Sequence, residues 1–220
     1  MQGQNVGGYE GPRTPNENEW EVAAELSRSI FFPQKSSWFE GFRTWPMGFT
    51  KEYAKNTFVM FHDGEPVSMT SRLERDFVVF GQRLRMGFIG GVCTHPQHRG
   101  KGLASTILSA CMNRFHANNV DFVYISGARQ LYYATGANHI GSFIRFQLDT
   151  AALGGVDYTR VSLKTATQED AELLSKLYQG EPVRFIRPCP DYQLTIEYGH
   201  CSGKACEFQI IEIDGTPVGY

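Results

Sequence analysis

One stretch decides how this sequence folds, Pro96-Gln97-His98-Arg99-Gly100-Lys101-Gly102-Leu103-Ala104. It opens a run of apolar residues at helical spacing, namely Leu103, Ile107, Leu108, Cys111 and Phe115. The first N–H groups of a helix lack intrahelical partners, and the dipole at that end favours anions. Gly100 and Gly102 let a ligand approach the backbone closely, while Arg99 and Lys101 add positive charge. The stretch therefore predicts a pyrophosphate-binding loop at a helix start.

Three strand-like runs precede this loop, at residues 56–62, 66–80 and 83–94. Asp63-Gly64 separates the first two and suits a tight hairpin turn. Gly90-Gly91 weakens pairing in the third run and indicates a bulge just before the loop. Further upstream, residues from Glu19 to Ile30 have the apolar spacing of a helix, with Asn18 as its expected N-cap.

The chain after the loop helix continues with shorter elements. The helix is expected to end at Asn118-Asn119, a buried-type strand follows at residues 122–125, then a helical piece at 130–135 and a last strand at 139–148. The expected order is thus helix, three antiparallel strands, helix, strand, helix, strand. That order indicates an α+β protein with a mixed sheet flanked by helices.

The two ends of the chain differ from this central part. Residues 1–18 are rich in Gly, Asn, Gln and Pro and are expected to form a mobile arm. After a domain at 19–150 comes a linker-like stretch at 151–157. Residues 59–67 then align with 210–218 through a shared D-G-x-P-V, and Leu26-Ser27-Arg28 aligns weakly with Leu174-Ser175-Lys176. These matches indicate that residues 158–220 begin a second, truncated unit of the same kind, with a chance hairpin as the alternative.

Composition restricts the functional class. The 220 residues are 41% hydrophobic, which is enough for a core, and their formal charge of −2 favours neither nucleic acid nor an anionic membrane as partner. Five cysteines without a C-x-x-C pair argue against a disulfide framework and a zinc site, so no metal is expected. The absence of a signal pattern and of an apolar run of about 20 residues makes a cytoplasmic protein the expectation.

The loop and its context resemble the GNAT (Gcn5-related N-acetyltransferase) superfamily, whose motif has the form Q/R-x-x-G-x-G/A. Gln97, Gly100, Gly102 and Ala104 fit that form within a resemblance that covers about residues 19–148. The resemblance implies a GNAT fold and acetyl-CoA as co-substrate. It assigns the pantetheine and the phosphates to the following residues: Val92, Cys93, Thr94, Gln97, Arg99, Gly100, Lys101, Gly102, Leu103, Ala104 and Ser105.

A second element of the resemblance is a Tyr four residues before a Gly, which implies Tyr132 as the general acid that protonates the departing thiolate. Ala137 stands where the usual final aromatic would be, and Tyr133 is the fallback; either tyrosine could instead be a packing aromatic. A base is not assigned, because turns, charged strands or phosphate contacts explain each candidate equally well. Those candidates are Glu65, Glu74, Asp76, Asp121, His95 and His98. Cys93 is expected to be a small core residue rather than a nucleophile.

The sequence therefore predicts an N-acetyltransferase that moves an acetyl group from acetyl-CoA to a primary amine by direct attack. The acceptor is a small molecule or a protein, and homo-oligomerisation stays open. The alternative is a non-catalytic CoA-binding module. The aromatic segment with Trp38, Phe39, Phe42 and Trp45 is expected on the acceptor side. The repeat also resembles the Eis-like multi-domain branch of the superfamily. A Walker-type phosphate loop is disfavoured, since G-x-x-x-x-G-K-[ST] is missing and the preceding strands read as antiparallel.

Overall fold

The computed structural model describes residues 4–36, 51–142, 144, 147, 154–155, 158–201 and 204–220, with side chains from Gly7 and Ala54 onward in the first two ranges. The elements of the first part are β1 (Gln4–Val6), β2 (Tyr9–Arg13), α1 (Glu17–Phe31), β3 (Thr57–His62), β4 (Glu65–Val79), β5 (Gln82–Thr94), α4 (Leu103–Ala117), β6 (Phe122–Ile125) and α5 (Gln130–Tyr133). Short 3-10 turns, η1 (Lys51–Asn56) and η2 (Pro96–His98), precede β3 and α4.

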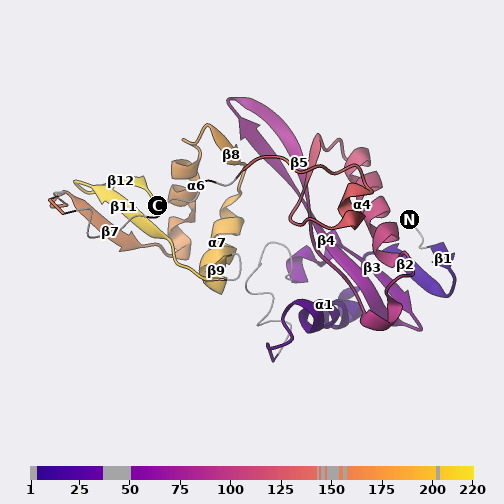
Figure 1. The fold of residues 1–220 in the computed structure, drawn as a ribbon. Helices are drawn as coiled ribbons and strands as arrows, with labels where there is room; N and C mark the ends of the chain where they lie inside the picture. The colour runs from indigo at the N-terminus through magenta and orange to yellow at the C-terminus, as the bar shows by residue number, and fades with distance from the viewer. Residues whose placement is uncertain are drawn as a thin grey trace.

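A seven-stranded mixed sheet organises this part in the order β1-β2-β3-β4-β5-β6, with β8 (Val183–Phe185) added to one edge of β4. All pairs are antiparallel except β5 with β6, which is parallel because α4 makes the crossover between them. Helix α1 lies on one face of the sheet and α4 on the other (Figure 1). The predicted α+β class with a mixed sheet flanked by helices is confirmed.

Each face of the sheet has its own core. Ala23 and Leu26 of α1 pack on Val59, Phe61 and Met69. On the other face, residues of α4 pack on Met60, Ile89 and Val92 among others; these α4 residues are Leu103, Ile107, Leu108, Cys111 and Phe115. The five apolar positions read from the sequence are therefore the buried stripe of the helix, each at most 6% exposed.

The strands before the loop and the short elements from β6 to α5 lie where the sequence predicts them. The turn between β3 and β4 has positive φ at both Asp63 and Gly64, which is the conformation that a two-residue hairpin requires. The last predicted strand, at 139–148, is wrong where it is described. Residues 139–142, 144 and 147 lie in no strand, and Ile140 is 88% exposed. Apolar and polar residues alternate in this stretch, but such a pattern forms a strand only where another strand offers an edge with which it can pair.

The N-terminal prediction also needs correction. Residues 9–13, expected in a mobile arm, form β2 and pair with β3 from Tyr9↔His62 to Arg13↔Val59. Helix α1 begins earlier than predicted, at Glu17. Its N-cap is Asn16 rather than Asn18: the Asn16 side chain accepts from the Glu19 backbone N–H at 3.0 Å, and the Glu19 carboxylate accepts from the Asn16 N–H at 2.8 Å. This reciprocal capping box fixes the helix start.

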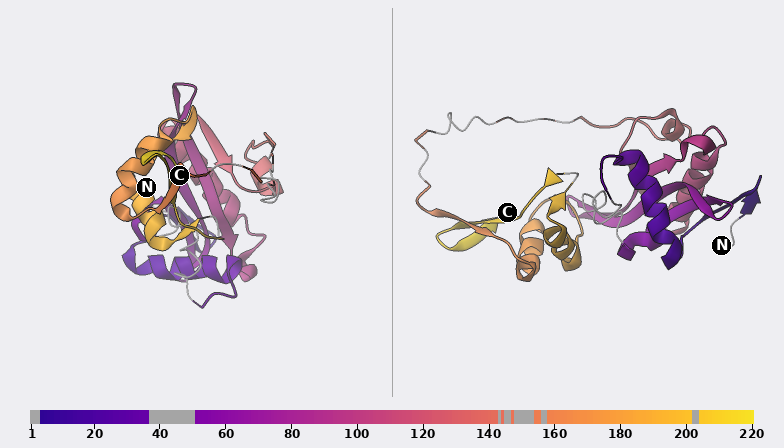
Figure 2. Two further views of the ribbon diagram at one scale, coloured as in Figure 1. Left: turned by 90° about the vertical axis from the view of Figure 1, so that its left-hand side faces the viewer. Right: turned by 90° about the horizontal axis from the view of Figure 1, so that it is seen from below.

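The remaining elements form a smaller part of the chain. They are β7 (Val161–Thr165), a 3-10 turn η4 (Gln168–Asp170), α6 (Ala171–Tyr178), β8, α7 (Cys189–Tyr198), β9 (His200–Cys201), β10 (Lys204–Ala205), β11 (Gln209–Ile213) and β12 (Thr216–Gly219). Strands β12-β11-β7 make a second sheet, packed on α6 and α7 through Leu174, Tyr192 and Ile210. In the right-hand view of Figure 2, this smaller part lies beside the part that holds the seven-stranded sheet. The predicted linker at 151–157 lies mostly outside the described residues.

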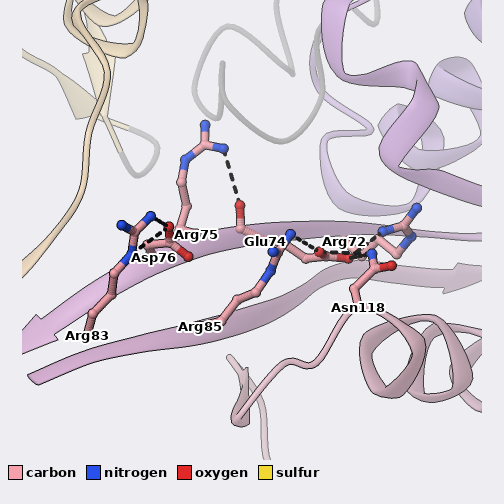
Figure 3. A network of polar contacts seen from close by, with 7 residues as sticks. All are labelled: Arg72, Glu74, Arg75, Asp76, Arg83, Arg85 and Asn118. Carbon is pink, nitrogen blue, oxygen red and sulfur yellow. Dashed lines mark hydrogen bonds and ion pairs between the residues drawn. The ribbon is translucent and has the colours of Figure 1, made fainter.

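The two parts meet at the far end of the β4–β5 hairpin. Strand β8 pairs with β4 from Phe77↔Phe185 to Val79↔Val183, and Arg75 binds the buried Asp191 of α7 through two hydrogen bonds of 3.1 Å. Beside this contact, Glu74 accepts hydrogen bonds from Arg72, Arg85 and Asn118 (Figure 3). This network ties the C-terminal end of α4 to the hairpin.

Candidate active site

The loop adopts the backbone that its glycines permit. After η2, Gly100 and Gly102 have φ of 75° and 76°, a left-handed conformation that strains any residue with a Cβ. Gly102 is the N-cap of α4, and the first intrahelical bond runs from the Thr106 N–H to the Gly102 carbonyl at 3.0 Å. The backbone N–H groups of residues 103–105 come before this first bond and have no acceptor within the helix, so they are available to an anion.

A cleft of about 460 Å³ opens directly in front of this loop. The residues that line it are Ile30, Phe31, Val92, Cys93, Thr94, His98, Arg99, Gly100, Lys101, Gly102, Leu103, Ala104, Ser105, Arg129 and Leu131. All but one of the predicted CoA-contacting residues are among them. Gln97, in η2, is the exception.

One wall of the cleft is the end of β5, which pairs with β4 but extends past its other neighbour, β6. The parallel pairing with β6 stops at Ile89↔Ile125, whereas β5 continues to Thr94. Opposite β4, a register shift between Met69 and Ser71 and the positive φ of Gly91 form the predicted bulge. Beyond Ile89, the edge of β5 that faces away from β4 therefore has no partner strand among the described residues. Such an edge suits the amides of a pantetheine arm.

The charge of the cleft is positive. Arg99, Lys101 and Arg129 line it, and no Asp or Glu is among its described lining residues. The Arg99 side chain is anchored by a 3.2 Å hydrogen bond from its Nε to the Thr94 carbonyl. A Cβ built on either Gly100 or Gly102 would meet no atom within 4 Å, so open space lies before both glycines. Donors, charge and space together fit the pyrophosphate of CoA.

An aromatic and imidazole cluster supports the loop from β2 and β3. The Tyr9 hydroxyl lies 3.0 Å from His98 Nδ1 and accepts a 2.7 Å hydrogen bond from Lys101 Nζ. The Tyr9 ring stacks on His62 at 4.7 Å between centroids. Partial burial and the positive charge of Lys101 lower the pKa of His98. The His98 imidazole is therefore neutral at neutral pH.

Tyr132 is largely buried and is not among the residues that line the cleft. It is 8% exposed and belongs to the core under α4, whereas its neighbour Leu131 lines the cleft. Burial raises the pKa of the Tyr132 phenol, so the hydroxyl stays protonated at neutral pH. Tyr133, the fallback, is 37% exposed and its ring lies against His139.

Cys93 lines the cleft but is not activated. Its side chain is 5% exposed, and burial raises the pKa of the thiol to about 12. A thiol in that state is a poor nucleophile. This agrees with the prediction that Cys93 is a core residue.

The candidate bases are mostly committed elsewhere. Glu74 accepts from three side chains, Asp76 pairs with Arg83, and Asp121 accepts from the Arg85 N–H at 2.6 Å. Glu65 is exposed beside the hairpin turn. The His95 ring lies against the His98 ring at 5.7 Å between centroids, and His98 alone of these candidates lines the cleft. The base stays unassigned.

Sequence reasoning missed several lining residues. Ile30 and Phe31 come from the end of α1, and Arg129 and Leu131 flank the start of α5. Only tertiary structure brings these segments to the loop, so no local pattern reveals them. The segment with Trp38, Phe39, Phe42 and Trp45 lies outside the described residues.

Across the ranges that the structure covers, no group of three His, Cys, Asp or Glu side chains is arranged to hold a metal ion. None of the helices described is long and apolar enough to cross a membrane.

A mixed sheet in which β5 extends past its parallel neighbour β6, together with a glycine loop at a helix start, is the architecture that the GNAT resemblance implies. Residues 12–140 match the family described as Acetyltransferase (GNAT) domain. The chain therefore belongs to the GNAT family. No curated protein sequence matches it.

Solved structures agree on the fold. The chain is similar to a GCN5-related N-acetyltransferase from Kribbella flavida, with 16% identity, a TM-score of 0.65, and coverage of 84% of this chain and 50% of that one. It is also similar to a probable N-acyltransferase from Enterococcus faecalis V583, with 15% identity, a TM-score of 0.68, and coverage of 93% and 52%. The chain thus spans about half the length of either protein. The narrower Eis-like resemblance stays a prediction.

Proposed function

We propose that this protein transfers an acetyl group from acetyl-CoA to a primary amine by direct attack. The observation that carries the proposal is the glycine loop at the start of α4, which faces a positive cleft. One wall of that cleft is the part of β5 that extends past β6. The N–H groups of the loop, together with Arg99 and Lys101, suit a pyrophosphate, and the edge of β5 suits a polar, extended arm. Family membership supports the same chemistry.

Acetyl-CoA supplies an activated thioester, and the residues of this chain orient it and move protons. In the proposed reaction the amine nitrogen bonds to the thioester carbon, the carbon–sulfur bond breaks, and the Tyr132 hydroxyl gives its proton to the leaving thiolate. The raised pKa of Tyr132 keeps that proton in place until transfer. The proton lost by the amine goes to water or to a base outside the assigned residues.

A non-catalytic CoA-binding module is the second candidate. It is favoured by one observation: the described lining residues of the cleft include no carboxylate that could accept the amine proton. Binding alone needs only the loop and the β5 edge. The proposal includes an acceptor amine that is carried by a small molecule or by a protein. It also includes association of the protein with further copies of itself.

Calorimetry with CoA and a thiol-release assay with acetyl-CoA and a panel of amines test the two candidates. Saturable CoA binding with amine-dependent thiol release supports the transferase. Binding without release for every amine supports the module. Absence of CoA binding overturns both.

A further inference from the structure

The two nitrogens of the His98 imidazole have different surroundings. Nδ1 lies 3.0 Å from the Tyr9 hydroxyl. Nε2 has no hydrogen-bond partner among the described residues, and it is accessible to solvent. The ring as a whole lines the cleft in front of the glycine loop. One nitrogen is therefore engaged within the protein, while the other is open to a ligand.

The hydrogen bonds that end at Nδ1 determine where the imidazole carries its proton. A lysine ammonium has donors only, so Lys101 donates to the Tyr9 oxygen at 2.7 Å. The single proton of the Tyr9 hydroxyl then goes to its other described partner, His98 Nδ1. Because Nδ1 accepts this bond, a neutral imidazole carries its own proton on Nε2. The chain from Lys101 through Tyr9 to His98 thus assigns the Nε2–H tautomer.

The groups that face this ring disfavour a second proton on it. Lys101 lies on the loop beside the ring. His62 of β3 and His95, which precedes η2, have ring centroids 5.1 Å and 5.7 Å from the His98 centroid. Asp63, in the turn after β3, has the opposite effect, but its carboxylate is exposed and lies 3.6 Å from His62 Nε2. Burial and the charge of Lys101 lower the pKa of His98, so the ring stays neutral at neutral pH.

An imidazole in this tautomer offers the cleft a donor and not a base. A general base needs a free lone pair, and the lone pair of His98 is on Nδ1, where the Tyr9 hydroxyl occupies it. No Asp or Glu among the described lining residues can accept from Nε2–H, so we expect the ligand to supply the acceptor. The space before Gly100, two residues along the chain, is where the proposed function places the pyrophosphate, whose oxygens are strong acceptors.

We propose that His98 is a binding residue for CoA, which donates its Nε2–H to an oxygen of the pyrophosphate and is not the base for the amine. Tyr9 is its positioning residue, because the Lys101–Tyr9 bond directs the phenol proton to Nδ1. The assignment rests on the proposed function, since it takes the cleft to hold CoA. It gives the pyrophosphate a neutral donor besides the loop N–H groups and the two cations.

Nitrogen NMR of the unchanged protein tests the tautomer. Long-range proton–nitrogen spectra distinguish Nε2–H from Nδ1–H, and the His98 signals are identified by their loss in His98→Asn. We expect the Nε2–H tautomer at neutral pH and a shift of Nε2 on saturation with CoA. In Tyr9→Phe the donor to Nδ1 is gone, so both tautomers should be present. An Nδ1–H tautomer in the unchanged protein, or the absence of a shift at Nε2 with CoA bound, overturns the proposal.

Calorimetry with two variants of His98 tests the contact. An Asn amide reaches the place of Nδ1 and a Gln amide reaches that of Nε2, so only Gln replaces the proposed donor. We expect His98→Asn to weaken CoA binding about tenfold and His98→Gln to bind within about threefold of the unchanged protein. His116→Asn, at an exposed histidine in the last turn of α4, is the matched control and should bind CoA as the unchanged protein does. Equal affinities of the Asn and Gln variants of His98 overturn the proposal.

Dephospho-CoA, which lacks the phosphate on the ribose, identifies the phosphate group. It keeps the pyrophosphate, so His98→Asn should weaken both ligands by the same factor. A loss confined to CoA would place the contact on the ribose phosphate and overturn the proposal. In the thiol-release assay, His98→Asn should raise the KM for acetyl-CoA and keep kcat, whereas a loss of kcat alone would make His98 a base.

The same measurements separate this assignment from the proposed function. If the unchanged protein does not bind CoA, the proposed function fails and the assignment fails with it. If CoA binds and neither His98 variant changes its affinity, only the assignment to His98 is rejected.

Discussion

Lys101 Nζ donates a hydrogen bond of 2.7 Å to the Tyr9 hydroxyl, which joins the phosphate-type loop to β2 near the N-terminus. Tyr9 is also in contact with His98 and is 8% exposed. The bond holds one of the cleft's cations in a defined place. An N-terminal strand that contains none of the loop motif therefore supports the candidate site.

Tyr9→Phe removes this acceptor and keeps the ring in the core. We expect the affinity for CoA to fall by about threefold to tenfold, since a hydrogen bond to a charged group at a partly exposed site contributes about 1 kcal/mol. Calorimetry with CoA measures the change. Tyr124→Phe, at an exposed tyrosine of β6, is the control and should bind CoA as the unchanged protein does. Equal affinities for both variants would show that Tyr9 does not position Lys101.

Glycine substitutions separate the loop's backbone strain from its role in binding. Gly102→Ala places a Cβ at φ 76°, which should cost about 1 kcal/mol of unfolding free energy. The Cβ meets no protein atom within 4 Å, so it extends into the space before the loop. We expect CoA affinity to fall at least about tenfold, as the pyrophosphate loses its close approach to the backbone.

Gly81→Ala is the control for this change. Gly81 has φ 85° and equally open surroundings, but it lies in the turn between β4 and β5, outside the lining of the cleft. It should cost the same stability and leave CoA affinity unchanged. Denaturant unfolding and calorimetry on both variants provide the comparison. A parallel loss of affinity in Gly81→Ala would assign the effect to stability alone.

The parts of the fold that the sequence predicts are those with local causes. The period of Leu103 to Phe115 specifies α4, Asp63-Gly64 specifies its turn, and Gly91 provides the bulge. The misses have long-range causes. β2 is rich in glycine and proline, and it becomes a strand because β3 pairs with it. Residues 139–142 have strand-like alternation but no strand partner in the described chain.

The candidate site likewise contains residues that a local pattern predicts and residues that only tertiary packing brings in. The loop lining was predicted because its glycines and cations are adjacent in sequence. Phe31 and Arg129 reach the cleft from other elements, and only packing brings them there. Tyr132 follows a motif, yet its burial depends on the whole core under α4.

Tyr132→Phe tests the proposed general acid. We expect kcat to fall by about a hundredfold or more while the KM for acetyl-CoA changes little, because only the proton of the leaving group is lost. The burial that raises the pKa of Tyr132 above 10 keeps it protonated over the neutral range. In the unchanged protein, deprotonation of the Tyr132 hydroxyl should therefore limit activity only at pH above 10. Tyr133→Phe is the matched control and should keep its activity. A reversal of the two results would assign the acid to Tyr133.

Cys93 distinguishes direct transfer from an acyl-enzyme. Its pKa of about 12 leaves the thiol protonated, so direct transfer should survive its removal. We expect Cys93→Ala to keep kcat within about threefold and to lose about 1 kcal/mol of stability from the small cavity. In the folded protein, thiol reagents should modify the exposed Cys206 well before Cys93. An acetylated Cys93 detected by mass spectrometry after incubation with acetyl-CoA would contradict direct transfer.

Asp191 tests how the two parts of the chain hold together. Its carboxylate is 3% exposed and binds Arg75 through both oxygens, next to the pairing of β8 with β4. Asp191→Asn leaves the Arg75 charge poorly compensated in a mostly buried contact, which should cost about 3 kcal/mol. Asp214→Asn breaks an exposed pair with Arg160 and should lower stability far less. Hydrogen exchange then identifies the place of the loss: amides of β8 should exchange faster in Asp191→Asn, while those of α4 stay protected. Uniformly faster exchange across both parts would mean instead that the pair stabilises the whole chain rather than this contact.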